Sequence, residues 1–203
     1  MEKNCKLRVV SYKWALFIFL TYNSLFITHN CFAQAQPKLV VGIVVDQMRY
    51  DYLYRFSEKY GKGGFKRLMN EGFLCKNAQY NYVPTFTGPG HASIYTGTTP
   101  AIHGIAANEW FDKKTKKEIY CTQDKNVTPV GSSSDAGLMS PKNLDATTIG
   151  DEIKIASNNK AKVVGISLKD RSSILPAGHA ADAAYWLDGS TGSFITSSFY
   201  RSD

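Results

Sequence analysis

The chain has 203 residues, of which 43% are apolar and 20% charged, a composition typical of a globular protein with one sizeable core. Its net charge is +7, but residues 36–203 carry only 20 basic side chains against 16 acidic ones. This weak and dispersed positive charge argues against a nucleic-acid partner. The densest basic cluster, residues 113–117, is expected on a solvated hairpin tip.

The first 35 residues have the organisation of a secretory signal peptide. Basic residues precede an apolar stretch over 14–27, and Ala33 and Ala35 supply the small residues of a cleavage site. Polar residues at 21–24 interrupt the apolar stretch, which makes it short for a membrane-spanning helix. We predict a signal peptide over 1–35 and a periplasmic or secreted protein without a stable membrane span after cleavage. An uncleaved anchor is the alternative.

The elements expected first along the chain are two strands and two helices. Residues 38–45 are continuously apolar and mostly β-branched, which predicts a fully buried parallel strand that ends at Asp46. Apolar residues at helical spacing predict a helix over 60–70, with Gly72 as its C-terminal stop. A short strand is expected near 73–80. A helix is expected over 91–96, ending at Gly97.

Further along, a hairpin is predicted over 105–120 with its turn at 112–115, followed by a loop over 126–143. A helix is expected over 145–157 and a second buried strand over 161–168, after which residues 169–171 open a loop. Residues 184–187 and 193–197 are expected to form a surface hairpin. The alternation of strands and helices predicts an α/β fold, a three-layer sandwich around a mainly parallel sheet.

Two side chains stand where such a fold binds ligands. Asp46 ends the first strand, and carboxyl ends of parallel strands are the usual ligand-binding edge. Thr87 precedes a helix, whose free N–H groups attract anions. A carboxylate and a metal-activated hydroxyl suit attack on a phosphoryl group. The alternatives are a turn-capping acid and an ordinary helix N-cap.

A second group of residues could bind phosphoryl oxygens. Lys169 and Arg171 follow the second buried strand, and Asn108 could donate an amide hydrogen bond to the same oxygens. Solvated surface charge and a turn-closing amide are the alternatives. His91, His103 and His179 lack metal-binding spacing and are expected to be structural. Outside the signal region, Cys75 and Cys121 either form a disulfide or remain free thiols.

Several motifs together resemble the alkaline phosphatase superfamily. They are VVDQMR at 44–49, GGFKR at 63–67, YVPTFTGPGH at 82–91, IHGIA at 102–106, SLKDR at 167–171 and SILPAGH at 173–179. The combination is similar to the secreted, phosphate-irrepressible alkaline phosphatase type, which uses a threonine nucleophile and is related to type I phosphodiesterases and nucleotide pyrophosphatases. The resemblance extends over 38–200, so residues 36–203 are expected to be the N-terminal portion of such a catalytic domain.

The resemblance implies hydrolysis of phosphate monoesters with two zinc ions through a phospho-enzyme. Asp46 would ligate one zinc and Thr87 would be the nucleophile on that zinc, while Asn108, Lys169 and Arg171 would contact the phosphoryl oxygens. The Lys/Arg pair points to monoesters, since a second anionic oxygen needs extra positive charge.

Relatives of this type are more than twice as long, and most of their zinc ligands have no counterpart here. The chain alone is therefore expected to have little or no activity. A non-catalytic phosphate- or partner-binding module and the phosphodiesterase branch are the alternatives.

Overall fold

The computed structural model describes residues 37–202, so the predicted signal peptide over 1–35 lies outside the described residues. The chain divides into two compact units at Ile43–Val44. The first described residues form no regular structure, and the strand predicted over 38–45 is wrong. Leu39 and Ile43 are 79% and 78% exposed. A strand needs a neighbour to accept its backbone hydrogen bonds, and no other described residue pairs with this segment.

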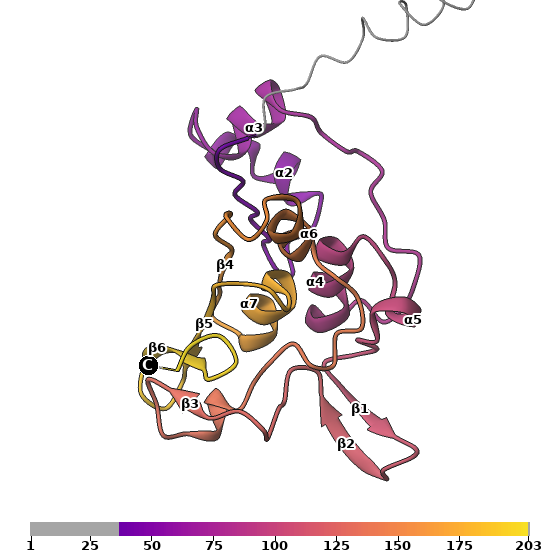
Figure 1. Ribbon diagram of the computed structural model, residues 1–203. Helices are drawn as coiled ribbons and strands as arrows, with labels where there is room; N and C mark the ends of the chain where they lie inside the picture. Colours follow the sequence, from indigo (N-terminus) through magenta and orange to yellow (C-terminus); the bar gives the residue numbers. More distant parts are fainter. Residues whose placement is uncertain (1–36, 203) are drawn as a thin grey trace, which may run out of the picture. The chain divides into compact units, whose positions relative to one another are not determined.

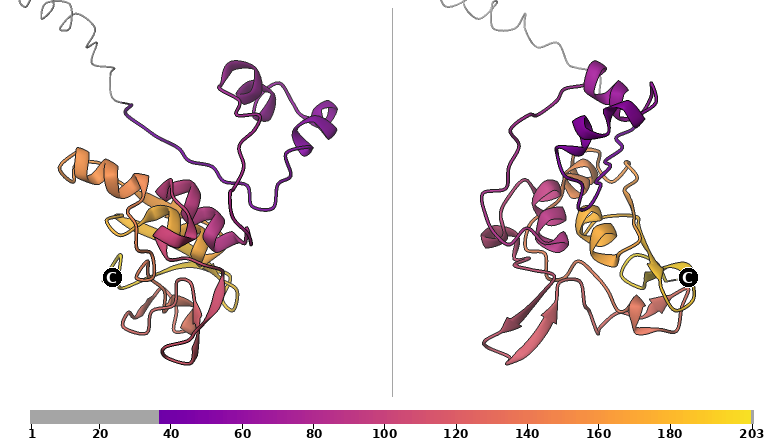
Figure 2. Two further views of the ribbon diagram at one scale, coloured as in Figure 1. Left: turned by 90° about the vertical axis from the view of Figure 1, so that its right-hand side faces the viewer. Right: turned by 180° about the vertical axis from the view of Figure 1, so that it is seen from behind.

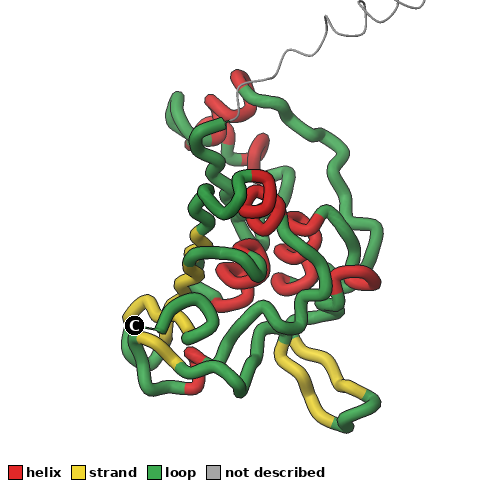
Figure 3. The backbone as a smooth tube through the Cα atoms, viewed as in Figure 1, coloured by secondary structure: helices red, strands yellow, loops and turns green. Residues whose placement is uncertain are grey.

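Short helices separated by loops follow (Figures 1 and 3). They are α2 (Tyr52–Arg55), the 3-10 turn η1 (Ser57–Lys59) and α3 (Phe65–Glu71). The predicted stop of α3 at Gly72 is confirmed, and the Gly72 N–H donates to the Leu68 carbonyl at 3.0 Å. The helix begins five residues later than expected, after three glycines at 61, 63 and 64. Residues 73–80 are not a strand, because no described residue pairs with them.

The next two helices are held together by a buried chain of hydrogen bonds. Helix α4 (Thr87–Thr96) ends at Gly97, as predicted, and α5 (Pro100–His103) follows. The Ile105 N–H donates to His103 Nδ1 at 3.2 Å, so this histidine carries its proton on Nε2 and donates to Ser93 Oγ at 2.9 Å. Ser93 Oγ lies 2.8 Å from the Tyr82 hydroxyl. Burial lowers the pKa of His103 and keeps it neutral.

The predicted hairpin is confirmed as strands β1 (Glu109–Asp112) and β2 (Lys117–Tyr120), which pair antiparallel. The Asp112 carboxylate accepts from the backbone of residues 114 and 115 and from the Thr115 hydroxyl, and these bonds fix the turn. The lysines of residues 113–117 lie on this exposed tip, as expected. The loop after the hairpin contains only the short strand β3 (Pro129–Val130) and the turn η2 (Asp135–Gly137).

The C-terminal part of the described chain forms a four-stranded sheet with helices beside it. Helix α6 (Ile149–Ala156) starts with a capping box between Thr148 and Asp151. It is followed by β4 (Val164–Ile166), α7 (Asp170–Ala177), β5 (Ala183–Asp188) and β6 (Ser193–Ser197). The strand order is β3-β6-β5-β4, and β4 and β5 are the parallel pair while the other neighbours are antiparallel.

Three details of this region differ from the sequence predictions. Residues 169–171 do not open a loop, because Lys169 is the N-cap of α7 and the helix begins at Asp170. Strand β4 is partly exposed rather than buried, since it lies at the sheet edge. The hairpin of β5 and β6 is not superficial, because Trp186 and Ile195 are 1% exposed.

Helix α7 joins two hydrophobic clusters. Leu175 packs in a cluster with residues of α4 and of the segments that flank the hairpin, including Ala92 and Cys121. Ile174 packs instead with residues of the sheet, including Trp186. Figure 2 shows α4 and α7 side by side from two further directions. The starts of both helices are therefore fixed relative to each other by the core. None of the helices within 37–202 has the length and apolarity required to cross a membrane.

Candidate active site

Asp46 and Thr87, predicted to meet, lie within hydrogen-bonding distance. The Thr87 hydroxyl donates to Asp46 Oδ2 at 3.2 Å, although the two residues are 41 positions apart. Thr87 is the first residue of α4, and its carbonyl accepts from His91 Nδ1 at 2.8 Å. The Thr87 hydroxyl is thus presented at a helix N-terminus, where the helix dipole favours negative charge.

Lys169 joins the same carboxylate from a third segment. Its Nζ donates to Asp46 Oδ2 at 3.2 Å, and its backbone forms the N-cap of α7. Partial burial raises the pKa of Asp46, but the Lys169 ammonium and the Thr87 hydroxyl outweigh that effect and leave it below the usual value. Asp46 is therefore an ionised acceptor shared by a cation and a hydroxyl.

The side-chain amide oxygen of Asn108 is hydrogen-bonded to the first turn of α4. The Gly88 N–H donates to Asn108 Oδ1 at 2.7 Å, which leaves the Asn108 NH₂ group as the end that can donate to a ligand. A Cβ on Gly88 would lie 3.2 Å from both Asn108 Oδ1 and the Ala107 carbonyl oxygen. The absence of a side chain at Gly88 thus leaves room for this asparagine.

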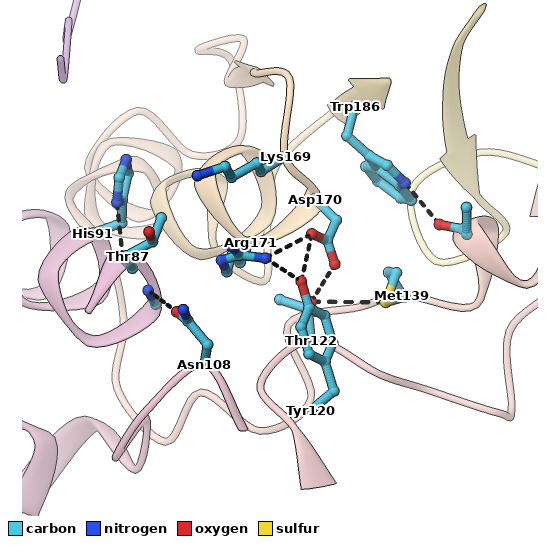
Figure 4. Close-up of polar contacts among 12 residues, drawn as sticks. Thr87, His91, Asn108, Tyr120, Thr122, Met139, Lys169, Asp170, Arg171 and Trp186 are labelled. Atoms are coloured by element: carbon cyan, nitrogen blue, oxygen red, sulfur yellow. Dashed lines mark hydrogen bonds and ion pairs between the residues drawn. The ribbon is translucent and has the colours of Figure 1, made fainter. Parts of the chain in front are cut away.

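Arg171 is held by partners that the sequence did not indicate (Figure 4). Its Nη1 donates to the Tyr120 hydroxyl at 2.6 Å, and that hydroxyl donates to Asp170 Oδ1 at 2.7 Å. Asp170 Oδ2 accepts from the Thr122 hydroxyl at 2.8 Å. In Figure 4, Arg171 lies between Asp170 and Thr87. Within the described part of the chain its side-chain hydrogen bond is to Tyr120 and not to Thr87.

Tyr120, Thr122 and Asp170 are therefore site-adjacent residues that sequence reasoning missed. Asp170 had a usable signal, because an acid between two expected anion-binding cations is unusual unless it has its own partners. Tyr120 and Thr122 had no local signal, since each contacts Asp170 from about fifty positions away in the chain.

Each of the three histidines contacts a neighbouring group in the described part of the chain, and their structural role stays a prediction. His91 and His103 hold helices α4 and α5, and His179 Nδ1 lies 3.5 Å from Asp151 Oδ2. The cysteine alternative is decided in favour of free thiols, with Cys75 exposed and Cys121 buried.

The donor set fits part of a zinc site. Catalytic zinc takes about three protein ligands, and a carboxylate and a hydroxyl on one locus supply two oxygen donors. Among residues 37–202, no three His, Cys, Asp or Glu side chains gather to hold a metal ion. Asp46 and Thr87 could therefore supply two of the donors that a catalytic zinc site needs.

Comparison with known proteins places these residues in context. Residues 40–202 match the family model described as type I phosphodiesterase / nucleotide pyrophosphatase. The chain is 59% identical over 166 residues to alkaline phosphatase PhoV of Synechococcus elongatus, covering 82% of this chain and 30% of that protein. It is 52% identical over 192 residues to alkaline phosphatase PafA of Elizabethkingia meningoseptica, covering 94% of this chain and 35% of that protein. The chain spans about a third of the length of these relatives.

A crystal structure of wild-type PafA matches this structure with a TM-score of 0.82 and 55% identity, covering 84% of this chain and 33% of that chain. The match confirms the predicted α/β fold class. A solved PafA variant, with a TM-score of 0.83 and 53% identity over 84% of this chain and 33% of that chain, carries four substitutions. They replace a threonine by serine and an asparagine, a lysine and an arginine by alanine.

Proposed function

Because this chain belongs to the type I phosphodiesterase / nucleotide pyrophosphatase family, we propose that it supplies the nucleophile and the phosphate-binding side chains of a zinc-dependent phosphomonoesterase. The observation that carries the proposal is the convergence of Thr87, Asp46 and Lys169 at the starts of two packed helices. A hydroxyl, a carboxylate and a cation within hydrogen-bonding distance suit attack on an anionic phosphorus ester.

The spacing of the residues supports the same proposal. The threonine and asparagine replaced in the PafA variant are 21 positions apart, as are Thr87 and Asn108. The replaced lysine and arginine are two positions apart, as are Lys169 and Arg171. The same four residue types thus recur here at the same separations within each pair.

The chemistry assigns one role to each side chain. Thr87 Oγ1 gives up its proton and forms a bond to phosphorus while the ester P–O bond breaks, and the leaving alkoxide takes up a proton. Water then cleaves the threonine phosphate, which releases inorganic phosphate and returns a proton to the Thr87 oxygen. Asn108, Lys169 and Arg171 donate to the phosphoryl oxygens. Asp46 and Thr87 would hold a zinc ion, which when bound lowers the pKa of the hydroxyl and neutralises charge on the phosphoryl group.

Two cations near the nucleophile favour phosphate monoesters as substrates. A monoester carries one more anionic oxygen than a diester, and the fixed charges of Lys169 and Arg171 stabilise that extra charge. Residues 1–35 are proposed to direct the protein to the periplasm or the exterior, where soluble phosphate esters would be the substrates.

A chimera tests the proposal, because the chain covers about a third of its relatives. Residues 38–200 replace the matching segment of the Elizabethkingia enzyme, and hydrolysis of para-nitrophenyl phosphate and its bis-ester is measured with zinc. We expect monoesterase activity that Thr87→Ala abolishes together with phospho-enzyme formation. Thr85→Ala is the matched control, since Thr85 is exposed in the same loop.

Three outcomes would refute parts of the proposal. Substantial turnover by Thr87→Ala would remove Thr87 as nucleophile. Equal losses of monoester and diester hydrolysis in Arg171→Ala would exclude a monoester-specific contact and favour the phosphodiesterase branch. Zinc-independent phosphate binding that survives Thr87→Ala, in a folded chimera without turnover, would identify a non-catalytic binding module.

A further inference from the structure

The Arg171 guanidinium is bound at one end and unengaged along one edge. Nη1 donates to the Tyr120 hydroxyl at 2.6 Å. Nε is buried and has no hydrogen-bond partner among the described residues, and none of them accepts from Nη2. Nε and Nη2 form the lateral edge of the guanidinium, which matches two oxygens of a phosphoryl group in a bidentate contact.

A buried donor without a partner is costly unless a ligand satisfies it. The arrangement of Asp170 explains why the edge stays unengaged. Its Oδ1 lies 3.9 Å from Arg171 Nη1, too far for a direct hydrogen bond. The Tyr120 hydroxyl stands between the two groups and the Thr122 hydroxyl binds the other carboxylate oxygen. The acid thus orients the arginine without occupying its donors.

We propose that Tyr120 and Asp170 are positioning residues that hold Arg171 by Nη1 and leave its Nε–Nη2 edge for two oxygens of one phosphoryl group. The inference rests on the proposed function, because it assigns the geometry of one of the phosphate contacts. Tyr120 acts as a relay, accepting from the arginine and donating to the carboxylate, so that each hydrogen bond has an ionised partner.

The relay also suits a site that works in alkaline solution. Burial and the Asp170 carboxylate raise the pKa of Tyr120 well above its ordinary value, although the Arg171 cation opposes this. The groups that face the phenol are Asp170, Arg171 and the buried Cys121 thiol. Tyr120 therefore keeps its proton, and the donor bond to Asp170 persists, at pH values where a free tyrosine ionises.

The side-chain NMR signals of isotope-labelled arginine in the full chain provide the test. The Arg171 signals are assigned by their loss in Arg171→Lys. In the wild type, hydrogen-bonded Nη1 restricts rotation of the guanidinium, so we expect separate, slowly exchanging Nη–H signals. Tyr120→Phe removes only the hydroxyl and should merge these signals. Tyr95→Phe is the control, because Tyr95 is a half-buried tyrosine of α4 whose hydroxyl makes no hydrogen bond to the described residues.

A titration with inorganic phosphate forms the second arm. Loss of a charge-assisted contact corresponds to about tenfold or more in affinity, so Tyr120→Phe should weaken phosphate binding by at least that factor while Tyr95→Phe leaves it unchanged. Asp170→Asn should act in the same direction as Tyr120→Phe. It replaces Tyr120→Phe as the test variant if the latter fails to fold by near-UV circular dichroism.

The two arms distinguish failure of this inference from failure of the proposed function. Unchanged Arg171 signals in both Tyr120→Phe and Asp170→Asn would overturn the positioning role. If the signals merge but wild-type and Arg171→Lys chains do not differ in phosphate binding, the positioning role stands and the phosphate contact of Arg171 is refuted.

Discussion

Replacing Thr196 by valine should stabilise the chain. Thr196 lies in β6, is 3% exposed, and its hydroxyl has no hydrogen-bond partner among the described residues. An unsatisfied buried hydroxyl costs about 1–3 kcal/mol, and valine has nearly the same shape without the polar atom. A central gain of about 2 kcal/mol corresponds to a rise in Tm of about 4–8 °C for a chain of this size.

The matched control is Thr122→Val, the same chemical change at an equally buried position. The Thr122 hydroxyl donates to the Asp170 carboxylate at 2.8 Å. Its removal should cost about 1.5–3 kcal/mol, the range for hydrogen bonds to charged groups, and lower Tm by about 3–12 °C. Replacing threonine by valine is thus expected to raise Tm at position 196 and to lower it at position 122.

Thermal unfolding followed by far-UV circular dichroism, with urea unfolding as a second measure, checks both signs. The m-values should remain unchanged, because neither substitution alters the surface exposed on unfolding. A Thr196→Val protein with an equal or lower Tm would show that the hydroxyl is satisfied and that the reasoning from the structure is wrong.

Three further results are expected. Although burial raises the pKa of Asp182, a backbone amide and two lysines hold it well below the usual range. Its contribution to stability is therefore present above about pH 3.9 and lost below it, so urea midpoints of wild type and Asp182→Asn should converge only in acid; a constant difference would contradict the assignment. Burial raises the pKa of Cys121 to about 12, so peptide mapping after alkylation of the native chain should find label on Cys75 and not on Cys121; equal labelling would exclude the buried environment. A Cβ at Gly165 would clash with the Ser173 carbonyl oxygen, so Gly165→Ala should lower the unfolding free energy by about 1–3 kcal/mol, and an unchanged urea midpoint would show that α7 shifts freely.

Local signals predicted the parts of the fold whose contacts are local. The hairpin turn is fixed by Asp112 within three residues, and Gly72 and Gly97 stop their helices where expected. The strand predicted over 38–45 depends on partners elsewhere, and its apolar sequence cannot specify them. For the same reason, periodicity could not show that the hairpin carrying Trp186 is buried.

The residues of the candidate site also differ in whether the sequence could indicate them. The sequence selects Asp46, Thr87 and Lys169, and their mutual contacts are observed, although the strand expected to end at Asp46 is not formed and Lys169 begins a helix instead of a loop. The partners of Arg171 could not be predicted, because Tyr120 reaches it from the end of a distant strand. Sequence patterns indicate which cationic side chains follow a strand, but not which neighbouring side chains orient them by hydrogen bonds.

Strand β4 has a consequence for handling this polypeptide. It is the terminal strand in the sheet order, and Val164, Ile166 and the following Leu168 are exposed. Unpaired backbone amides and carbonyls beside exposed apolar side chains form a sheet edge that can pair with strands of other molecules. Preparations of the isolated chain should therefore self-associate as their concentration rises, and a lysine at Ile166 would be the first substitution to keep them monodisperse.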